Sequence, residues 1–404
     1  MKRLLTLAIL CATLFAAGCS SSDEGQMPVI DLEKALGNIE SVNLSSIASD
    51  IEYIPIETAD SALMGNAVNI AIDENYIFIG STQKQKTIHV FTPEGKFLRN
   101  VGSKGRAKGE YIAIKDLIPI SNQKAVMVIG GKKLVTYSAE DGAVIQDIEI
   151  DEVVPQMEDT TASDPKEYSI TYDNSGYFWA REVNNKNLSQ RCIKLDASLH
   201  PVTEFKLKDA FKSAVEVDMG GRKAVLPWWL YSCNINCMEN NTYAHFFPAD
   251  TLYKITDGKL VPEISVDYGT LKGNYKEKVS LDDLWIMDIT HLTPNLVKLG
   301  VRVPQSRGVF PDKGNVVKLL YNKEQNKSCI LEYSNVIGSA AFTNDLDGGM
   351  PFYPVTYYNN KMYMCVDAGL FIEMSQKYNS PKMKEVAAQL TEESNPVIVA
   401  VTLK

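Results

Sequence analysis

Short apolar runs rich in Ile, Val, Tyr and Phe, separated by Asp, Asn and Gly, follow one another along the chain beyond residue 27. Residues 70–79 predict two strands around a polar turn. Residues 88–91 and 96–101 predict a hairpin, because Pro93 and Gly95 stand between them where a turn favours these residues. The pattern is typical of strands joined by tight turns rather than of amphipathic helices.

This strand–turn–strand unit recurs, with turns near residues 95, 142, 197, 258 and 334, roughly 45 to 75 residues apart. Repeated four-stranded units at such a spacing predict the blades of a β-propeller. A β-sandwich is the alternative, but it rarely needs six similar meanders. The predicted blades cover about residues 65–104, 110–152, 166–208, 222–268, 290–336 and 338–376.

Helical patterns are confined to Tyr275–Asp288 and Pro381–Leu390, where Pro381 suits a first helical turn. The chain then ends in an apolar strand, residues 396–402. A propeller must protect its open edge, so we expect this strand to pair with residues 50–56. The sequence therefore predicts an all-β fold: a six-bladed β-propeller with a short C-terminal helix and terminal-strand closure.

The first 19 residues predict a targeting segment. Lys2 and Arg3 precede an apolar run, Leu4–Phe15, that is shorter than the roughly 20 residues of a transmembrane helix. The run ends in Ala-Ala-Gly-Cys19, which resembles a bacterial lipoprotein signal whose cysteine is acylated; an ordinary secretory signal is the alternative. We predict a signal peptide over 1–18, a tether over 19–40 and a propeller over 41–404.

Composition narrows the class of protein further. The apolar fraction of 45% and the charged fraction of 23% exclude a disordered chain. The formal net charge is −9, and loss of Lys2 and Arg3 leaves 39 basic against 50 acidic residues, which disfavours nucleic acid as a partner. Five cysteines follow Cys19, an odd number without metal-site spacing, so we predict buried strand cysteines. They are Cys192, Cys233, Cys237, Cys329 and Cys365.

The glycine-rich stretch from Ile88 to Tyr111 resembles the six-bladed β-propeller lipoproteins of Bacteroidetes, an NHL-like family. Residues 44–58, 250–255 and 344–349 match other parts of that family, and the resemblance covers most of residues 40–404. One departure is that Ala107 and Lys108 replace a usual Gly-Pro. The resemblance implies an outer-membrane lipoprotein on the cell surface or the periplasmic face, often found beside polysaccharide-uptake systems.

Two groups of candidate ligand-binding residues lie in the first half of the chain and its middle. Arg106, Glu110 and Tyr111 share the glycine-rich loop, where Arg106 is suited to grip a carboxylate; a structural turn capped by Glu110 is the alternative. Trp228 and Trp229 are neighbours, so one is expected to be exposed for stacking on a sugar, unless both are core.

The third group, Asn344, Asp345 and Asp347, precedes Gly348-Gly349 and leads into the last blade. We expect both carboxylates at a propeller mouth, holding a ligand or a Ca²⁺ ion, although the calcium-loop motif is incomplete. A turn in which the carboxylates accept backbone amides is the alternative.

No HExxH, GxSxG or P-loop motif occurs, but a propeller can assemble a site from loops of several blades. We therefore predict a lipid-anchored binding module for a glycan, a peptide or a partner protein, with a link to polysaccharide uptake. The alternatives are a polysaccharide lyase or hydrolase with a loop-borne site and a structural subunit of an uptake complex. Apart from Ca²⁺ at Asp345 and Asp347, no cofactor is expected.

Overall fold

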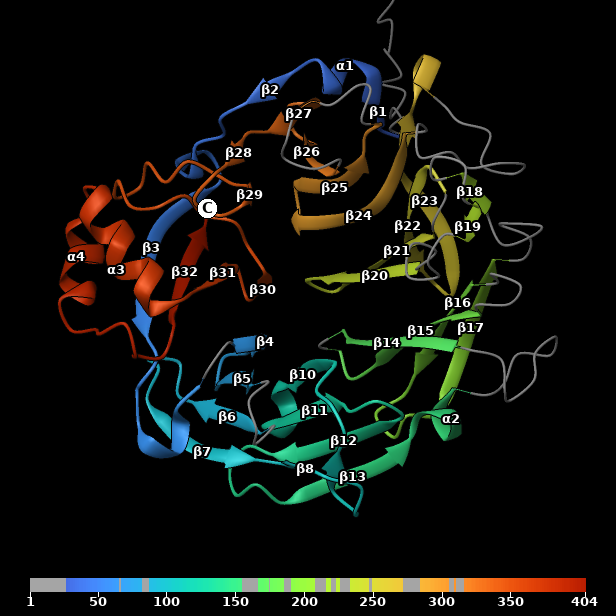
Figure 1. Cartoon of the computed structure of the whole chain (residues 1–404). Coiled ribbons are helices and arrows are strands. Elements are labelled where there is room, and N and C mark those ends of the chain that lie inside the picture. The colour runs from blue at the N-terminus through green and yellow to red at the C-terminus, as the bar shows by residue number, and fades with distance from the viewer. Residues whose placement is uncertain are drawn as a thin grey trace, which may run out of the picture.

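Six β-sheets surround a central axis, and the chain passes through them in order (Figure 1). The computed structural model describes residues 27–64, 67–81, 87–154, 166–173, 175–184, 190–207, 216–218, 223–225, 233–246, 249–271, 284–304, 309 and 316–404. The predicted six-bladed β-propeller is confirmed.

The first three blades are antiparallel four-stranded sheets whose strands follow the chain order from the axis outward. Blade 1 consists of β4 (Ala67–Ile72), β5 (Ile77–Ser81), β6 (Ile88–Phe91) and β7 (Phe97–Val101). Blade 2 consists of β10 (Asp116–Ile120), β11 (Ala125–Ile129), β12 (Lys133–Ser138) and β13 (Val144–Glu149). Blade 3 consists of β14 (Lys166–Tyr172), β15 (Phe178–Asn184), β16 (Gln190–Leu195) and β17 (Pro201–Leu207).

Blades 4 and 5 each gain a fifth, parallel strand from the N-terminal part of the chain. Blade 4 consists of β20 (Cys233–Met238), β21 (Asn241–Phe246), β22 (Thr251–Thr256) and β23 (Lys259–Asp267), with β1 (Val29–Asp31) added outside β23. Blade 5 consists of β24 (Trp285–Thr293), β25 (Leu296–Arg302), β26 (Val316–Asn322) and β27 (Lys327–Leu331), with β2 (Ile39–Glu40) added outside β27.

The folded part of the chain thus begins before residue 41, where the tether was expected to end. Between β1 and β2, Asp31 caps helix α1 (Leu32–Leu36) by accepting a 2.9 Å hydrogen bond from the amide of Lys34. The side chains of Ile30, Leu32 and Ala35 are at most 1% exposed. Residues 29–40 are therefore a clasp across the outer edges of blades 4 and 5, and the expected tether is too long.

Blade 6 is closed by both ends of the chain, as the sequence predicted. Its strands are β30 (Thr356–Tyr358), β31 (Lys361–Val366), β32 (Val397–Leu403) and β3 (Ala48–Pro55), in that order from the axis. The C-terminal strand β32 pairs antiparallel with both β31 and β3, and Tyr53 lies opposite Val399. The outermost strand of the last blade therefore comes from the N-terminal part of the chain.

Two helices between β31 and β32 cover the outer side of blade 6 (Figure 1). Helix α4 (Pro381–Ala387) confirms the predicted C-terminal helix, whereas α3 (Ala368–Lys377) was not predicted. The expected helical insertion is wrong at its end, since Trp285–Asp288 belong to strand β24; residues 275–283 lie outside the described part. No helix in the described ranges is long and apolar enough to span a membrane.

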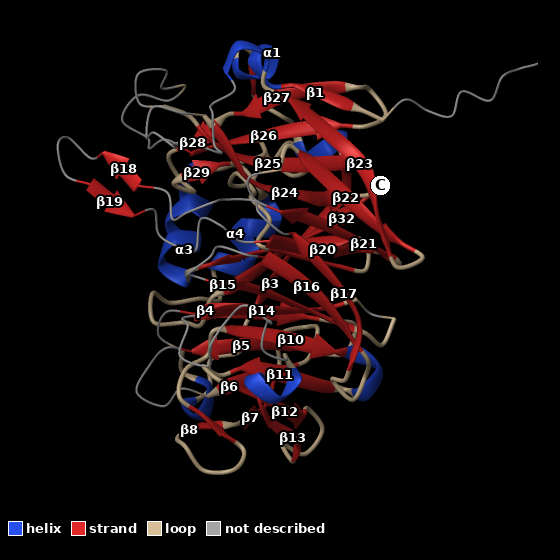
Figure 2. Cartoon of the chain, turned by 90° about the vertical axis from the view of Figure 1, so that its right-hand side faces the viewer, coloured by secondary structure: helices blue, strands red, loops and turns tan. Residues whose placement is uncertain are grey.

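Short elements complete the description. In side view, β18–β19, β28–β29 and β8 lie on the side of the propeller opposite the β22–β23 hairpin (Figure 2). The short elements of the described chain include β8 (Ser103–Lys104), β9 (Glu110–Tyr111), α2 (Ile150–Val153), β18 (Glu216–Asp218), β19 (Lys223–Val225), β28 (Tyr333–Ser334) and β29 (Ser339–Ala340).

The hydrophobic core lies between neighbouring blades. Because side chains alternate along a strand, each blade has two faces. One face of blade 5 presents Val297 and Leu299 to Tyr243 of blade 4. The other presents Leu296 and Leu320 to blade 6. Each blade is therefore stabilised by both of its neighbours, so the ring depends on its closure.

Candidate functional site

The innermost strands of all six blades line one cavity on the propeller axis, with a volume of about 480 Å³. Its walls come from β4, β10, β14, β20, β24 and β30, and Lys298 of β25 also reaches it. The wall combines backbone and apolar side chains with many polar ones, so it offers a ligand both kinds of contact. The axial cavity is the candidate functional site.

Polar groups gather where the inner strands begin. A guanidinium nitrogen (Nη1) of Arg181 donates to Oδ1 of Asn234 at 2.7 Å, and Nδ2 of Asn234 contacts the carbonyl of Met287 at 3.5 Å. Asp116 opens β10 and is exposed, and the charge of Arg181 acts on its carboxylate. We call this end the strand-start mouth.

The surroundings of Asp116 shift the pKa of its carboxyl. Its side chain reaches water, but protein atoms crowd it, and this burial raises the pKa of its carboxyl above the usual range. The amide of Leu117, which donates to Oδ1 at 2.9 Å, and the charge of Arg181 oppose that rise in pKa. Asp116 lines the cavity and is exposed, so its carboxyl is placed to form hydrogen bonds with a ligand.

Tyrosines surround the opposite end, where the inner strands finish. The Tyr358 hydroxyl donates to the carboxylate of Glu74 and lies 3.4 Å from Ser121 Oγ. The Tyr172 hydroxyl donates to Oδ1 of Asn122 at 3.1 Å. These bonds link blades 1, 2, 3 and 6 and hold the rings of Tyr172 and Tyr358 against the cavity. We call this end the strand-end mouth.

A buried histidine lies in the wall of blade 5. His291 is 3% exposed, and its ring packs on that of Tyr243 with 4.0 Å between ring centroids. Neither of its ring nitrogens has a hydrogen-bond partner within the described ranges. Burial, assisted by the charges of Lys323 and Lys254, lowers the pKa of His291 to about 3. His291 is therefore neutral at physiological pH.

This histidine predicts a loss of stability in mild acid. The unfolded chain takes up a proton at His291 near pH 6.5, whereas the folded chain does so only near pH 3, so stability falls as the pH drops through this window. Between pH 7 and pH 5 we expect a loss of about 2 kcal/mol from this residue. Urea unfolding of His291→Phe at both pH values should show a change smaller by that amount.

The control is His200→Asn, because the His200 side chain is 78% exposed. This variant should keep the acid sensitivity of the original chain. An unchanged acid sensitivity in His291→Phe would contradict the assignment, whatever the other buried histidines contribute.

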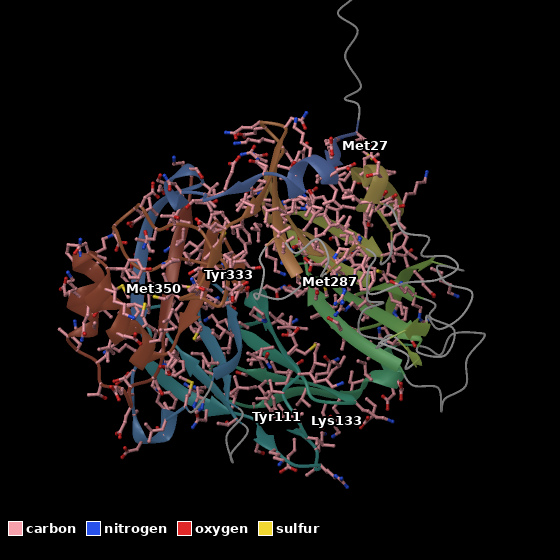
Figure 3. All side chains as sticks on the ribbon, turned by 45° about the horizontal axis from the view of Figure 1, so that its top comes forward. Met27, Tyr111, Lys133, Met287, Tyr333 and Met350 are labelled. Carbon is pink, nitrogen blue, oxygen red and sulfur yellow. The ribbon has the colours of Figure 1, made fainter. Side chains whose placement is uncertain are left out.

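The glycine-rich loop predicted as a binding site lies at the outer part of blade 2. Oε2 of Glu110 accepts the amide of Ala107 at 2.8 Å, so Glu110 does cap the turn. Tyr111 is fully buried against Tyr137, and Figure 3 shows it near Lys133. The side chain of Arg106 is exposed, and none of these residues lines the axial cavity.

The Asp loop leads into the last blade as expected, but its two carboxylates point to different partners. Asp345 accepts the amide and the hydroxyl of Ser45 at 2.8 and 2.5 Å. Oδ1 of Asp347 accepts Nδ2 of Asn344 at 2.8 Å, the Tyr53 hydroxyl at 3.2 Å and the Gly349 amide at 3.0 Å. The expectation that both lie at a propeller mouth is wrong, since Tyr53 belongs to the outermost strand β3.

Hydrogen bonding also lowers the pKa of the Asp345 carboxyl in this loop. Burial would raise the pKa of Asp345, but the two bonds from Ser45 outweigh it and lower that pKa. In the described ranges, no group of three or more His, Cys, Asp or Glu side chains is arranged to hold a metal ion. A Ca²⁺ ion at Asp345 and Asp347 stays a prediction.

Other candidates from the sequence have separate outcomes. Trp228 and Trp229 lie outside the described residues. Four of the five predicted strand cysteines are described with their side chains, and none of the four forms a disulfide. Burial raises the pKa of Cys237 to about 12 and that of Cys329 to about 11, so both thiols are inert.

The residues of the cavity were missed because no motif marks them. Asp116 lines the cavity, Arg181 and Asn234 lie beside it at the strand-start mouth, and these residues follow one another at separations of 65 and 53 positions, so only the ring of blades brings them together. A signal was available in the first strand of each predicted blade, because inner strands line the axis of any propeller. Asp116 and Tyr172 stand at the beginning and the end of two such strands.

Comparison with known proteins agrees with the fold. The family model described as Domain of unknown function (DUF4934) matches residues 27–402. A solved structure of a "putative exported protein" from Bacteroides fragilis is 17% identical, with a TM-score of 0.59, over 91% of this chain and 98% of that one. A DUF4221 family member from Bacteroides vulgatus is 12% identical, with a TM-score of 0.45, over 88% and 97%. No curated protein matches the chain.

Proposed function

The chain belongs to the DUF4934 family, and we propose that its propeller is a binding module that holds part of a glycan in the axial cavity. The observation that carries the proposal is the cavity of about 480 Å³, lined by all six innermost strands. A cavity of this size accommodates a few sugar rings but no folded protein.

The chemistry of the wall favours a sugar over a peptide. The rings of Tyr172 and Tyr358 supply apolar surfaces on which the apolar face of a sugar ring stacks. Asp116, Arg181 and Asn234 supply acceptors and donors at the strand-start mouth. A sugar offers both an apolar ring face and many hydroxyls, so one ligand satisfies both ends of the cavity.

Export and lipid anchoring are part of the same proposal. The lipoprotein-like segment ending at Cys19 supports them, as does the description of the Bacteroides fragilis protein as exported. The proposal also includes a relationship to NHL-like propellers and a link to polysaccharide uptake. The part of the chain that the structure describes starts at the outer edge of blade 4, where Met27 precedes β1 (Figure 3). An anchor attached at this edge leaves the cavity free for a ligand.

The anchor is tested by replacing its acceptor. Cys19→Ser should release the protein from the membrane fraction and remove the mass of the acyl chains, because the thiol is the acylated group. Fractionation and mass spectrometry of the mature protein measure both. A variant that stays in the membrane fraction with an unchanged mass would contradict acylation of Cys19. That result would not bear on the proposed glycan site in the axial cavity.

The binding site is tested with a glycan array followed by calorimetry on the best ligand. Tyr172→Ala should weaken binding about tenfold or more, the effect of losing roughly 1.4 kcal/mol of contact. Tyr177→Ala is the matched control, because Tyr177 lies beyond the end of the same strand but does not line the cavity. Equal losses in both variants, or a screen in which no glycan binds, would contradict the proposal.

An enzyme remains the second candidate because of Asp116. A carboxyl with a raised pKa beside an arginine is suited to donate a proton, as a polysaccharide hydrolase or lyase requires. Mass spectrometry of the bound oligosaccharide after incubation separates the two functions. Cleavage that Asp116→Asn abolishes would favour the enzyme, whereas an intact ligand favours the binding module.

A further inference from the structure

Blade 5 carries a row of charged side chains on the face it presents to blade 6. On strand β25, Leu296 packs into the core shared with blade 6, and residues at even positions follow it on the same face. On β26, Leu320 packs into that core as well. Lys298 lies opposite Leu320, so the amino groups of Lys298 and Lys318 leave the sheet on this same face.

The two lysines share a single carboxylate. Gly300 pairs with Asp288 on one side and with Lys318 on the other, so the three residues form a row across β24, β25 and β26. The carboxylate of Asp288 occupies the space that a side chain at Gly300 would fill. From there Oδ1 of Asp288 lies 3.5 Å from Nζ of Lys298. We call Asp288, Lys298 and Lys318 the lysine cluster.

One positive charge of this cluster has no counterion. Asp288 offsets the charge of Lys298, and Lys318 forms no ion pair or hydrogen bond in the described ranges. Burial, together with the charge of Lys298, lowers the pKa of Lys318, while Asp288 opposes that shift. The next even position, Arg302, adds a third cation and stacks on Trp285 at 5.0 Å. This excess stands in a chain whose formal net charge is −9.

The lysine cluster is continuous with the axial cavity. Lys298 contributes to the wall of that cavity. The Tyr353 side chain is close enough for the charges of Lys298 and Asp288 to act on its hydroxyl. A ligand in the cavity therefore meets the Lys298 ammonium directly, and Lys318 and Tyr353 lie next to Lys298 at the blade 5–blade 6 boundary. Two ammonium groups beside a phenol are donors suited to the oxygens of an anion.

We propose that the lysine cluster binds a carboxylate or sulfate group of the ligand, so that the glycan in the axial cavity is an acidic one. The specificity rests on the proposed function, but the anion site is a separate claim. A half-buried lysine without a counterion is costly, and an anionic ligand reduces this cost on binding. A neutral glycan would leave Lys318 unpaired, so the cluster selects against it.

The experiment compares an oligogalacturonate with its methyl ester by calorimetry. We expect the original chain to bind the acidic oligosaccharide at least tenfold more tightly than the methyl ester. We expect Lys318→Met to abolish this preference, so that the variant binds the acid and the ester with similar affinities. Lys318→Arg should keep the preference because it keeps the charge. Lys323→Met is the matched control. The Lys323 ammonium already forms a 2.9 Å ion pair with Glu263, and Lys323 does not line the cavity.

Sodium sulfate alone, followed by thermal melting, separates a glycan from a free anion. A rise in melting temperature that Lys318→Met loses, without binding of any oligosaccharide, supports the anion site and overturns the glycan proposal. Equal binding of the ester and the acid overturns the anion site and leaves the glycan proposal standing. Unchanged preference for the acid in Lys318→Met also overturns the anion site. If Lys318→Met fails to fold, Lys298→Met provides the same comparison.

Discussion

Truncation of the chain after residue 394 is expected to abolish cooperative unfolding of the whole propeller. The deletion removes β32, which pairs with β31 on one side and with β3 on the other, so two sheet edges open at once. Val397, Ile398, Val399 and Val401 are at most 1% exposed. Burial of such side chains contributes about 1.5–3 kcal/mol each, and their sum approaches the 5–15 kcal/mol of a typical native state.

Circular dichroism during heating measures this loss. A chain that starts at Met27 is the control, because it keeps every described strand and should melt as the full chain does. The point variants Val399→Asp and Thr402→Asp give a finer comparison, since Val399 is 1% exposed and Thr402 is only half-buried. A truncated chain that keeps its melting transition would contradict the closure by β32.

The closure and the blades were predictable because both depend on local patterns. Alternating apolar residues and turn residues mark each hairpin, and the apolar run at 396–402 needs partners on both sides. Helix α4 was predictable from Pro381, and Ser380 caps it by accepting the amide of Met383 at 3.0 Å. Strands β1 and β2 were missed, because strands of two or three residues are too short for a recognisable period.

The site was harder to predict than the fold. Sequence reasoning selected loops with glycine and carboxylates, but the partners of Glu110 and Asp347 are other groups of the protein. Glycine at position 348 is required by its backbone, with φ of +74°, and not by a ligand. The cavity wall combines residues from all six blades, and their approach depends on blade order and tilt. Neither is encoded in a local motif.

The second large effect concerns Asp347, which joins three separate parts of the chain. Its carboxylate accepts from Tyr53 on β3, from Asn344 in its own loop and from Ser380 at the start of α4. The side chains of Asn344 and Ser380 are 5% exposed or less, so water cannot replace the lost acceptor. Each unsatisfied buried donor costs about 1–3 kcal/mol, and we expect Asp347→Ala to lose about 3 kcal/mol or more of unfolding free energy.

Two comparisons isolate this role of Asp347. Asp345→Ala should cost only about 1 kcal/mol, because Asp345 is exposed and bonds Ser45 alone. The double change Asp345→Asn, Asp347→Asn tests the Ca²⁺ hypothesis, since amides still accept hydrogen bonds but bind cations poorly. Urea unfolding with Ca²⁺ and with a chelator measures both effects. Equal costs for Asp345→Ala and Asp347→Ala would contradict the joining role. A Ca²⁺-dependent stabilisation that the double variant loses would show instead that the carboxylates hold a cation. The cation would then replace the hydrogen-bond donors that surround the carboxylates in this structure.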